Sequence, residues 1–273
     1  MRAAYYEANG AARKVLRLSE VETPQPGRGE VRVRLAVSGV NPSDVKSRAG
    51  LTRKIAFPRV IPHSDGAGEI DQVGEGVSPS RVGERVWVWN GQWRRPFGTA
   101  AQSIVLPSEQ AVPLPTHIGM DVGACLGIPA YTAYQAVLLT GIAEGSTVLV
   151  AAGAGAVGHY AIQFAKKRKA TVITTVSSPA KGEIARRAGA DHVVDYKRED
   201  VGERIMALAG KRGVDSVPVP AAEQHHDEVS LRLLDATGAA RPRDRRDHAH
   251  ARRRRARPQR GAELRARRHR GGA

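Results

Sequence analysis

Cysteine is almost absent from the chain, whose 273 residues include only Cys125. A single cysteine excludes an internal disulfide framework and any zinc lobe built from several cysteines. No apolar run is long enough to span a membrane, because the longest, around 122–142, is interrupted by glycine, proline and glutamine. The first residues also lack the apolar core of a signal peptide. We therefore expect a cytoplasmic protein with no membrane partner.

Acidic residues are scarce beside basic ones, because 43 Lys and Arg against 27 Asp and Glu give a net charge of +16. Half of that excess lies in residues 218–273, which hold 15 arginines, no lysine and 7 acidic residues. Residues 235–273 also lack Ile, Val, Phe, Trp, Tyr and Met. Such a segment cannot offset its conformational entropy by burying apolar surface. The preceding part of the chain is mildly basic, which suits an anionic cofactor.

The chain before that basic segment divides into two patterns. Residues 1–118 are mostly β, with proline and glycine between short strands, and a small, partly open barrel would fit them. The strands are expected at 31–37, 68–73, 85–89 and 101–106. Residues 119–217 instead alternate helices with strands, which is typical of one βαβαβ half of a doubly wound parallel sheet. Its elements are expected as helix 121–139, strand 148–152, helix 157–168, strand 170–176, helix 179–189, strand 192–195, helix 199–210 and a strand that starts at Val214.

A glycine motif follows the first strand of the second segment. Gly153, Gly155 and Gly158 form G-x-G-x-x-G between an apolar run and a sequence that can form a helix. In that context the first glycine permits a tight turn, the second a close approach of backbone to phosphate, and the third helix–strand packing. We expect the loop to bind a dinucleotide pyrophosphate through the residues Gly153, Ala154, Gly155, Ala156, Val157 and Gly158. A purely structural glycine-rich turn is the alternative.

Several ordered motifs give the chain a family resemblance from Met1 to about Val217. They are GVNPSDVKSRAG (39–50), HSDGAGEIDQVGEGV (63–77), GERVW (83–87), IPAYTAYQAVL (128–138), GSTVLVAAGAGAVGHYAIQFAK (145–166) and RRAGADHVVDY (186–196). With these motifs the chain resembles the zinc-independent quinone oxidoreductase (zeta-crystallin-like) branch of the medium-chain dehydrogenase/reductase superfamily. The resemblance implies a GroES-like N-terminal domain and a Rossmann domain, here incomplete. It also implies NADPH, hydride transfer to a quinone or an activated alkene or carbonyl, and a homodimer.

The positions that hold zinc in related alcohol dehydrogenases carry other residues here. Asn41 stands where the first cysteine ligand would be, and Ser64 stands where the histidine would be. His63 is displaced by one position, and one histidine beside Asp65 does not make a tetrahedral site. We expect no metal. Without a Lewis acid, the chemistry shifts to substrates already polarised to accept a hydride.

The cofactor preference is predicted from the end of strand 170–176. NAD-preferring Rossmann domains carry an acidic residue about 20 residues past the glycine loop, but Ser177, Ser178 and Lys181 occupy that region. Two hydroxyls and an ammonium can bind a 2′-phosphate, so we expect NADP. Tyr196 resembles the family's contact to the adenosine phosphate. Alternatively, Lys181 is a solvated helix residue and Tyr196 an ordinary packing residue.

The reacting end is suggested by the resemblance alone. Asn41 and Asp44 are expected in a loop after a strand, near the nicotinamide, with Asn41 bonding cofactor or substrate; a turn residue before Pro42 is the alternative. Thr132 matches a threonine that lies beside the cofactor phosphates in the family. The alternative is an ordinary threonine that faces its own helix and does not contact the cofactor. Lys46 departs from a tyrosine of some quinone reductases, so an enone stays open beside a quinone. The protein would supply placement and electrostatics for the cofactor's chemistry.

Residues 218–273 admit three interpretations. A basic tail around 252–255 would bind nucleic acid nonspecifically, because it lacks aromatic residues for base stacking; a solvated extension would also fit. We favour a reading-frame change near Ser216, because the family pattern stops inside a strand rather than in a linker. The chain would then be an inactive, self-associating form. A non-enzymatic nucleotide- or RNA-binding protein is the alternative function.

Overall fold

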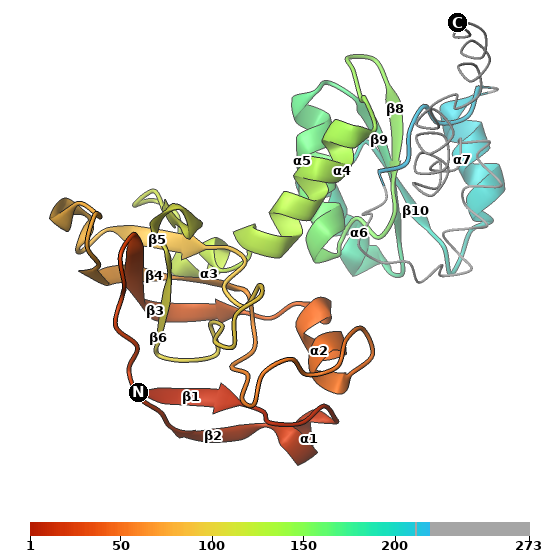
Figure 1. Ribbon diagram of the computed structural model, residues 1–273. Helices are drawn as coiled ribbons and strands as arrows, with labels where there is room; N and C mark the ends of the chain where they lie inside the picture. The colour runs from red at the N-terminus through yellow and green to blue at the C-terminus, as the bar shows by residue number, and fades with distance from the viewer. Residues whose placement is uncertain (211, 219–273) are drawn as a thin grey trace, which may run out of the picture.

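The computed structural model describes residues 1–210 and 212–218, which form two lobes (Figure 1). The N-terminal lobe is built on antiparallel strands and the second lobe on parallel strands. The predictions for residues 219–273 lie outside the part of the chain that the structure describes. The frame change therefore stays a prediction.

The antiparallel sheet has the strand order β6-β3-β4-β5-β7. Its strands are β3 (Glu30–Gly39), β4 (Asp65–Val73), β5 (Arg85–Val88), β6 (Ser103–Pro107) and β7 (Ala111–Pro113). Alternate side chains of β3 are buried, with Val31 and Val33 fully inaccessible, because successive side chains of a strand point to opposite faces. Register shifts between β3 and β4 curl the sheet. The four strands expected in this segment are confirmed.

A small hairpin-like pair precedes that sheet and was not expected from the sequence. It consists of β1 (Arg2–Tyr5) and β2 (Arg17–Glu20), which pair antiparallel around α1 (Ala12–Val15). All four residues of β2 are exposed, so the alternation that marks a half-buried strand is missing from its sequence.

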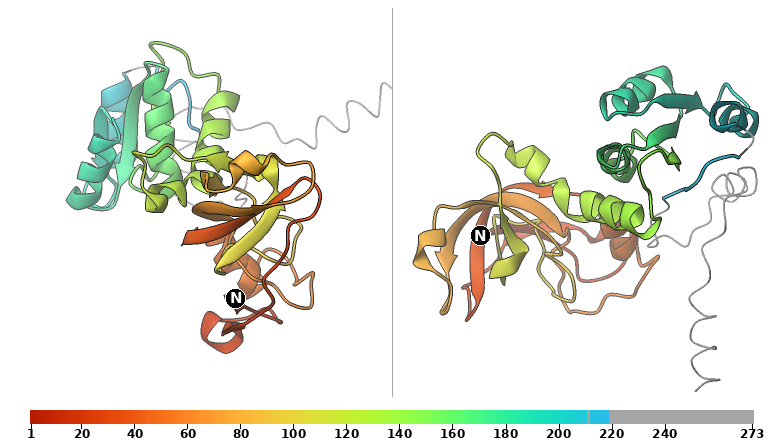
Figure 2. Two further views of the ribbon diagram at one scale, coloured as in Figure 1. Left: turned by 90° about the vertical axis from the view of Figure 1, so that its left-hand side faces the viewer. Right: turned by 90° about the horizontal axis from the view of Figure 1, so that it is seen from above.

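The parallel sheet has the order β10-β9-β8. Its strands are β8 (Thr147–Val150), β9 (Thr171–Val176) and β10 (His192–Asp195), and its helices are α5 (Ala156–Lys167), α6 (Pro179–Arg187) and α7 (Val201–Ala209). Figure 2 shows helices on both faces of this sheet, the layering of a doubly wound fold. The strand expected from Val214 is a single parallel bridge between Ser216 and Val148 on the free side of β8.

The helix expected over 121–139 is interrupted. The structure has α3 (Met120–Gly123), a π-helical turn η3 (Leu126–Ala130) and α4 (Tyr131–Leu139) in its place. Pro129 lies inside η3 and cannot donate a backbone hydrogen bond, which breaks the regular helical ladder. The interrupted run connects the two lobes (Figure 1). No helix in the described residues is long and apolar enough to cross a membrane.

Candidate functional site

The glycine loop connects β8 to α5 in a conformation that excludes larger side chains. A Cβ at Gly153 would overlap the Thr174 hydroxyl, and a Cβ at Gly158 would overlap the carbonyl oxygen of Ala152. Ala152 itself adopts a left-handed φ of 52°, which makes the turn sharp. The glycines are therefore required by close packing on both sides of the loop, as the motif predicts.

The helix that follows the loop begins without a side-chain cap. Gly155 is its N-cap and offers no side chain to the first turn. The backbone N–H groups of Ala156, Val157 and Gly158 therefore have no acceptor within the helix. Such a terminus attracts an anion through these donors and the helix dipole. The geometry fits a pyrophosphate next to Ala154 and the three donors.

The predicted adenosine-binding residues meet at the carboxyl end of β9. The Lys181 ammonium donates a hydrogen bond to the Ser177 hydroxyl at 3.0 Å, and the Ser178 hydroxyl caps α6 by accepting from the Lys181 N–H at 3.4 Å. Tyr196 directly follows β10, and its N–H donates to the Val176 carbonyl at 3.1 Å. Two hydroxyls and an ammonium thus lie next to β9, with the backbone of Tyr196 on the neighbouring strand, and no carboxylate follows β9 before Glu183.

Of the two residues expected in a loop after a strand, Asn41 lies there and Asp44 does not. Asn41 follows β3 in the short connection to α2 (Pro42–Ala49) and is the N-cap of that helix, whereas Asp44 lies in its first turn. The expectation for Asp44 was wrong because Asn-Pro followed by an acidic residue is also a helix start signal. The Asp44 carboxylate accepts from the Asn41 N–H at 2.8 Å. A capping box with Asn41 thus accounts for Asp44, while the N–H of the Asn41 amide is directed elsewhere.

Asp65 is the partner of that amide, and sequence reasoning assigned it no role beyond its proximity to His63. The Asn41 amide N–H donates to the Asp65 carboxylate at 2.8 Å, and the Ile128 backbone N–H donates to both carboxylate oxygens at 3.0 and 2.9 Å. Asp65 is 1% exposed. It joins the start of α2 to η3, and a Cβ at Gly127 would overlap it. The only sequence signal was an acidic residue that opens an otherwise buried strand.

Burial raises the pKa of both carboxylates to about 6. For Asp65, the hydrogen bonds from Asn41 and Ile128 partly oppose this rise, and the negative charge of Asp44 adds to it. For Asp44, the Asn41 N–H and the Arg53 charge oppose the effect of burial. Two acidic groups with raised pKa values in one cluster are typical of a functional site.

The glycine-loop helix lies close to this cluster. Tyr160 on α5 has a raised pKa because of burial first and then because of charges on Cys125 and Asp65. Thr132, half-buried in the first turn of α4, lies on a helix that packs against α5. Trp89 of the antiparallel lobe stacks on Tyr131 of α4, with ring centroids 5.9 Å apart. The turn η3, whose Ile128 N–H donates to Asp65, also packs against α5, so the glycine-loop helix and the Asn41–Asp65 pair adjoin the same turn.

The residues at the zinc-ligand positions do not fit a metal. The N–H of the Asn41 amide is held by Asp65, and neither Asn41 nor Ser64 is a usual zinc ligand. The ring Nδ1 of His63 lies 3.0 Å from the Ser38 hydroxyl. Among the described residues no group of three or more His, Cys, Asp and Glu could hold a metal ion.

Comparison with known proteins identifies both lobes. Residues 27–116 match a family model described as an alcohol dehydrogenase GroES-like domain, and residues 156–240 match one described as a zinc-binding dehydrogenase. The second match extends past residue 217 into residues that the structure does not describe.

Among curated relatives, a 2-haloacrylate reductase from a Burkholderia species is 33% identical over 203 residues, which are 72% of this chain and 60% of the relative. A quinone oxidoreductase from Rattus norvegicus is 32% identical over 228 residues, 82% of this chain and 68% of the relative. The chain spans about 60% of the length of the first curated relatives it matches.

Two solved structures are similar in fold. The Escherichia coli quinone oxidoreductase complexed with NADPH has a TM-score of 0.67 at 27% identity, over 78% of this chain and 64% of that one. An NAD-dependent alcohol dehydrogenase has a TM-score of 0.74 at 32% identity, over 80% of this chain and 70% of that one. The similar structures therefore include one complexed with NADPH and one described as NAD-dependent.

Proposed function

The chain belongs to the zinc-independent quinone oxidoreductase-like family of the medium-chain dehydrogenase/reductase superfamily, and we propose that it is an NADPH-dependent reductase of a quinone or an activated alkene or carbonyl. The observation that carries this proposal is the proximity of two features. A glycine loop with free helix N–H donors lies near a buried Asn41–Asp65 pair, across the junction between the lobes.

The cofactor would be held by residues of the parallel-sheet lobe. The backbone of 153–158 would bind the pyrophosphate, with Thr132 beside it, and Ser177, Ser178, Lys181 and Tyr196 would surround the adenosine phosphate. The absence of a carboxylate directly after β9 favours NADPH over NADH, because no acidic group repels the 2′-phosphate. When bound, the reduced nicotinamide supplies a hydride to the substrate.

Asn41 is the side chain best placed to orient the reacting groups. Its N–H is committed to Asp65, so its amide oxygen is the atom that can accept a hydrogen bond from a carboxamide or a substrate. Asp44 holds the backbone of Asn41 in place. Solvent or a cofactor hydroxyl would deliver the proton that completes the reduction.

The location, the oligomeric state and the domain bounds are proposed from the family resemblance. We propose a cytoplasmic homodimer that acts on a small molecule, with a GroES-like domain at 1–118 and a nucleotide-binding domain from 119 onward. A quinone oxidoreductase and a 2-haloacrylate reductase among the relatives support the substrate class.

The test is oxidation of NADPH by the purified full chain, followed at 340 nm with a benzoquinone and with an enone as separate acceptors. Turnover with either acceptor supports the proposal. Binding of NADPH without turnover of any acceptor would instead favour the non-enzymatic nucleotide-binding alternative.

A further inference from the structure

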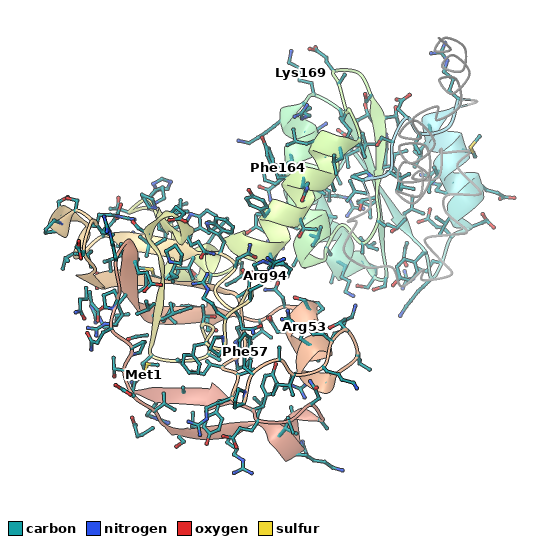
Figure 3. All side chains as sticks on the ribbon, in the orientation of Figure 1. Met1, Arg53, Phe57, Arg94, Phe164 and Lys169 are labelled. Carbon is teal, nitrogen blue, oxygen red and sulfur yellow. The ribbon has the colours of Figure 1, made fainter. Side chains whose placement is uncertain are left out.

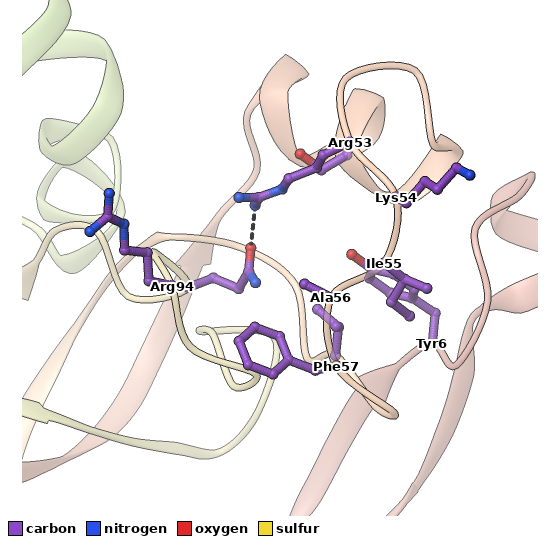
Figure 4. A pocket seen from close by; sticks show the side chains of 10 residues that line it. Tyr6, Arg53, Lys54, Ile55, Ala56, Phe57 and Arg94 are labelled. Atoms are coloured by element: carbon purple, nitrogen blue, oxygen red, sulfur yellow. Dashed lines mark hydrogen bonds between the residues drawn. The ribbon is translucent and has the colours of Figure 1, made fainter.

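A cavity of about 260 Å³ lies in the antiparallel lobe beside α2. Its walls come from α2, from the segment 53–60 and from the loop around 92–94, which Figure 4 shows converging on one space. Tyr6, Ile55 and Phe57 supply apolar surface, and Arg53, Lys54 and Arg94 supply positive charge. Figure 3 places Arg53 and Arg94 at the side of this lobe nearer the parallel-sheet lobe.

The three cations of the cavity form no ion pair within the described residues. None of the lining residues is acidic, although the negative charge of Asp44 on α2 interacts with Arg53. The Arg53 guanidinium donates to the neutral Gln92 side chain, at 3.0 Å (Figure 4). Positive charge around a partly apolar cavity with no acidic residue in its lining favours an anionic ligand.

The cations are also held in place. Gln92 is buried and donates from its amide to the Arg95 carbonyl at 2.9 Å, which directs its oxygen towards Arg53. Arg94 adopts a left-handed φ of 56°, and its guanidinium lies over the Trp93 ring at 5.6 Å from the centroid. Strained backbone conformations of non-glycine residues concentrate at binding sites. Arg53 is therefore held by Gln92 at the wall of the cavity, whereas the Arg94 guanidinium rests on Trp93, which is not among the lining residues.

The cavity adjoins the reacting end. The Arg53 charge lowers the pKa of Asp44 and of Tyr6, so the guanidinium lies within electrostatic reach of the helix turn that Asn41 caps. A short molecule with its anionic end on Arg53 would lie beside α2, the helix that Asn41 caps and whose Ser47 lines the cavity. A neutral quinone would leave the cations without a partner.

We propose that this cavity binds the carboxylate of the substrate, so that the preferred acceptor is a small activated alkene that carries a carboxylate. This inference rests on the proposed reductase function. The planar guanidinium matches a carboxylate by paired hydrogen bonds, and the apolar wall suits a short hydrocarbon body. In the reduction, the alkene carbon β to the activating carbonyl forms a bond to the hydride. The π electron pair moves to the α-carbon and carbonyl, a solvent proton completes the second C–H bond, and the nicotinamide is oxidised.

The experiment compares an acid with its neutral ester on the full chain. The acceptors are (E)-4-oxopent-2-enoate and its methyl ester, and the binding probes are the saturated 4-oxopentanoate and its methyl ester, titrated calorimetrically without cofactor. Arg53→Gln removes the charge, and Lys169→Gln removes an exposed charge at the far end of the other lobe (Figure 3). We expect Arg53→Gln to raise the KM for the acid and the Kd of its saturated analogue about tenfold, with the ester unchanged within about twofold. Lys169→Gln should change neither.

The outcomes separate the cavity from the reaction. Binding of 4-oxopentanoate that depends on Arg53, without NADPH oxidation by either acceptor, supports the cavity and contradicts the proposed function. NADPH oxidation with equal KM values for acid and ester, unchanged in Arg53→Gln, supports the function and overturns the carboxylate site. Calorimetric titration that detects no preference for the acid over its ester also overturns it. Arg53→Lys keeps the positive charge but cannot form the paired hydrogen bonds of a guanidinium. It should therefore show a preference for the acid over the ester that lies between those of the unchanged chain and Arg53→Gln.

Discussion

The cofactor end of the candidate site is formed by backbone groups, whereas its reacting end is formed by side chains. The cofactor end uses backbone: three glycines, a sharp turn at Ala152 and the uncapped N–H groups of α5. The reacting end uses side chains, with Asn41, Asp44 and Asp65 linked by hydrogen bonds across α2, β4 and η3. A backbone cradle tolerates almost no change at its glycines, whereas a side-chain cluster can be tuned by charge and pH.

The largest loss of cofactor affinity is expected from Gly158→Ala. The added methyl group would overlap the backbone of Ala152, so the loop must move away from the phosphate position. Overpacking of this kind costs about 1–3 kcal/mol, and we expect NADPH affinity to fall up to about a hundredfold. Fluorescence titration of NADPH measures the loss.

Gly182→Ala is the matched control for that change. Its Cβ would meet its nearest neighbour at 3.4 Å, which is ordinary contact, and alanine favours the helix interior. We expect unchanged affinity and equal or higher stability. If Gly158→Ala binds NADPH as well as Gly182→Ala does, the close-packed glycine cradle is not what holds the cofactor.

At the reacting end, Asp65→Ala should destabilise the chain by about 4 kcal/mol. It leaves the Asn41 amide and the Ile128 N–H buried without an acceptor, at a cost of about 1–3 kcal/mol for each orphaned group. Glu69→Ala on the same strand removes a half-exposed carboxylate paired with Arg34 and should cost at most about 1 kcal/mol. Urea unfolding of both variants gives the difference, and equal losses would contradict the bridging role of Asp65.

These two ends also differ in how far the sequence predicts them. The glycine spacing, the strands around it and the cluster of Ser177, Ser178 and Lys181 follow from local patterns, because backbone cradles and caps are built from consecutive residues. Asp65 was not assigned because its partners lie 24 and 63 positions away in the sequence. The break at Pro129 was missed because the apolar pattern over 121–139 continues across it, and β2 was missed because all of it is exposed.

The pH dependence of stability should reveal the side-chain end. The pKa of Asp65 rises from 3.8 to about 6 on folding, so between these values the folded chain binds more protons than the unfolded chain. Its free energy of unfolding therefore falls as pH rises from about 4 to 6, by up to about 3 kcal/mol for this group. Asp65→Asn should flatten that slope in urea titrations at pH 4.5, 5.5 and 6.5. A slope that is unchanged in the variant would assign the pH dependence to other groups, with Asp44 the first to examine by Asp44→Asn.

A smaller effect is expected from Lys181→Ala at the adenosine position. We expect the full chain to bind NADPH at least tenfold more tightly than NADH, or about 1.4 kcal/mol, because Ser177, Ser178 and Lys181 stand where an acidic residue would favour NADH. Removing the ammonium should narrow that ratio without changing NADH affinity. Lys167→Ala, at the other end of α5, is the control for loss of one exposed charge. Equal affinities for the two cofactors in the unchanged chain would contradict the interpretation of this cluster.

The smallest expected effect is that of a chelator, which should change nothing. Asn41 directs an N–H at Asp65, and the ring Nδ1 of His63 faces the Ser38 hydroxyl, so both side chains already have hydrogen-bond partners within the described residues. We expect less than one zinc ion for every ten chains by elemental analysis after purification. EDTA should shift neither the thermal unfolding midpoint nor the Kd of NADPH. One tightly held zinc per chain, whose removal by EDTA lowers the midpoint, would show that the reacting end rearranges around a metal rather than around the Asp65 carboxylate.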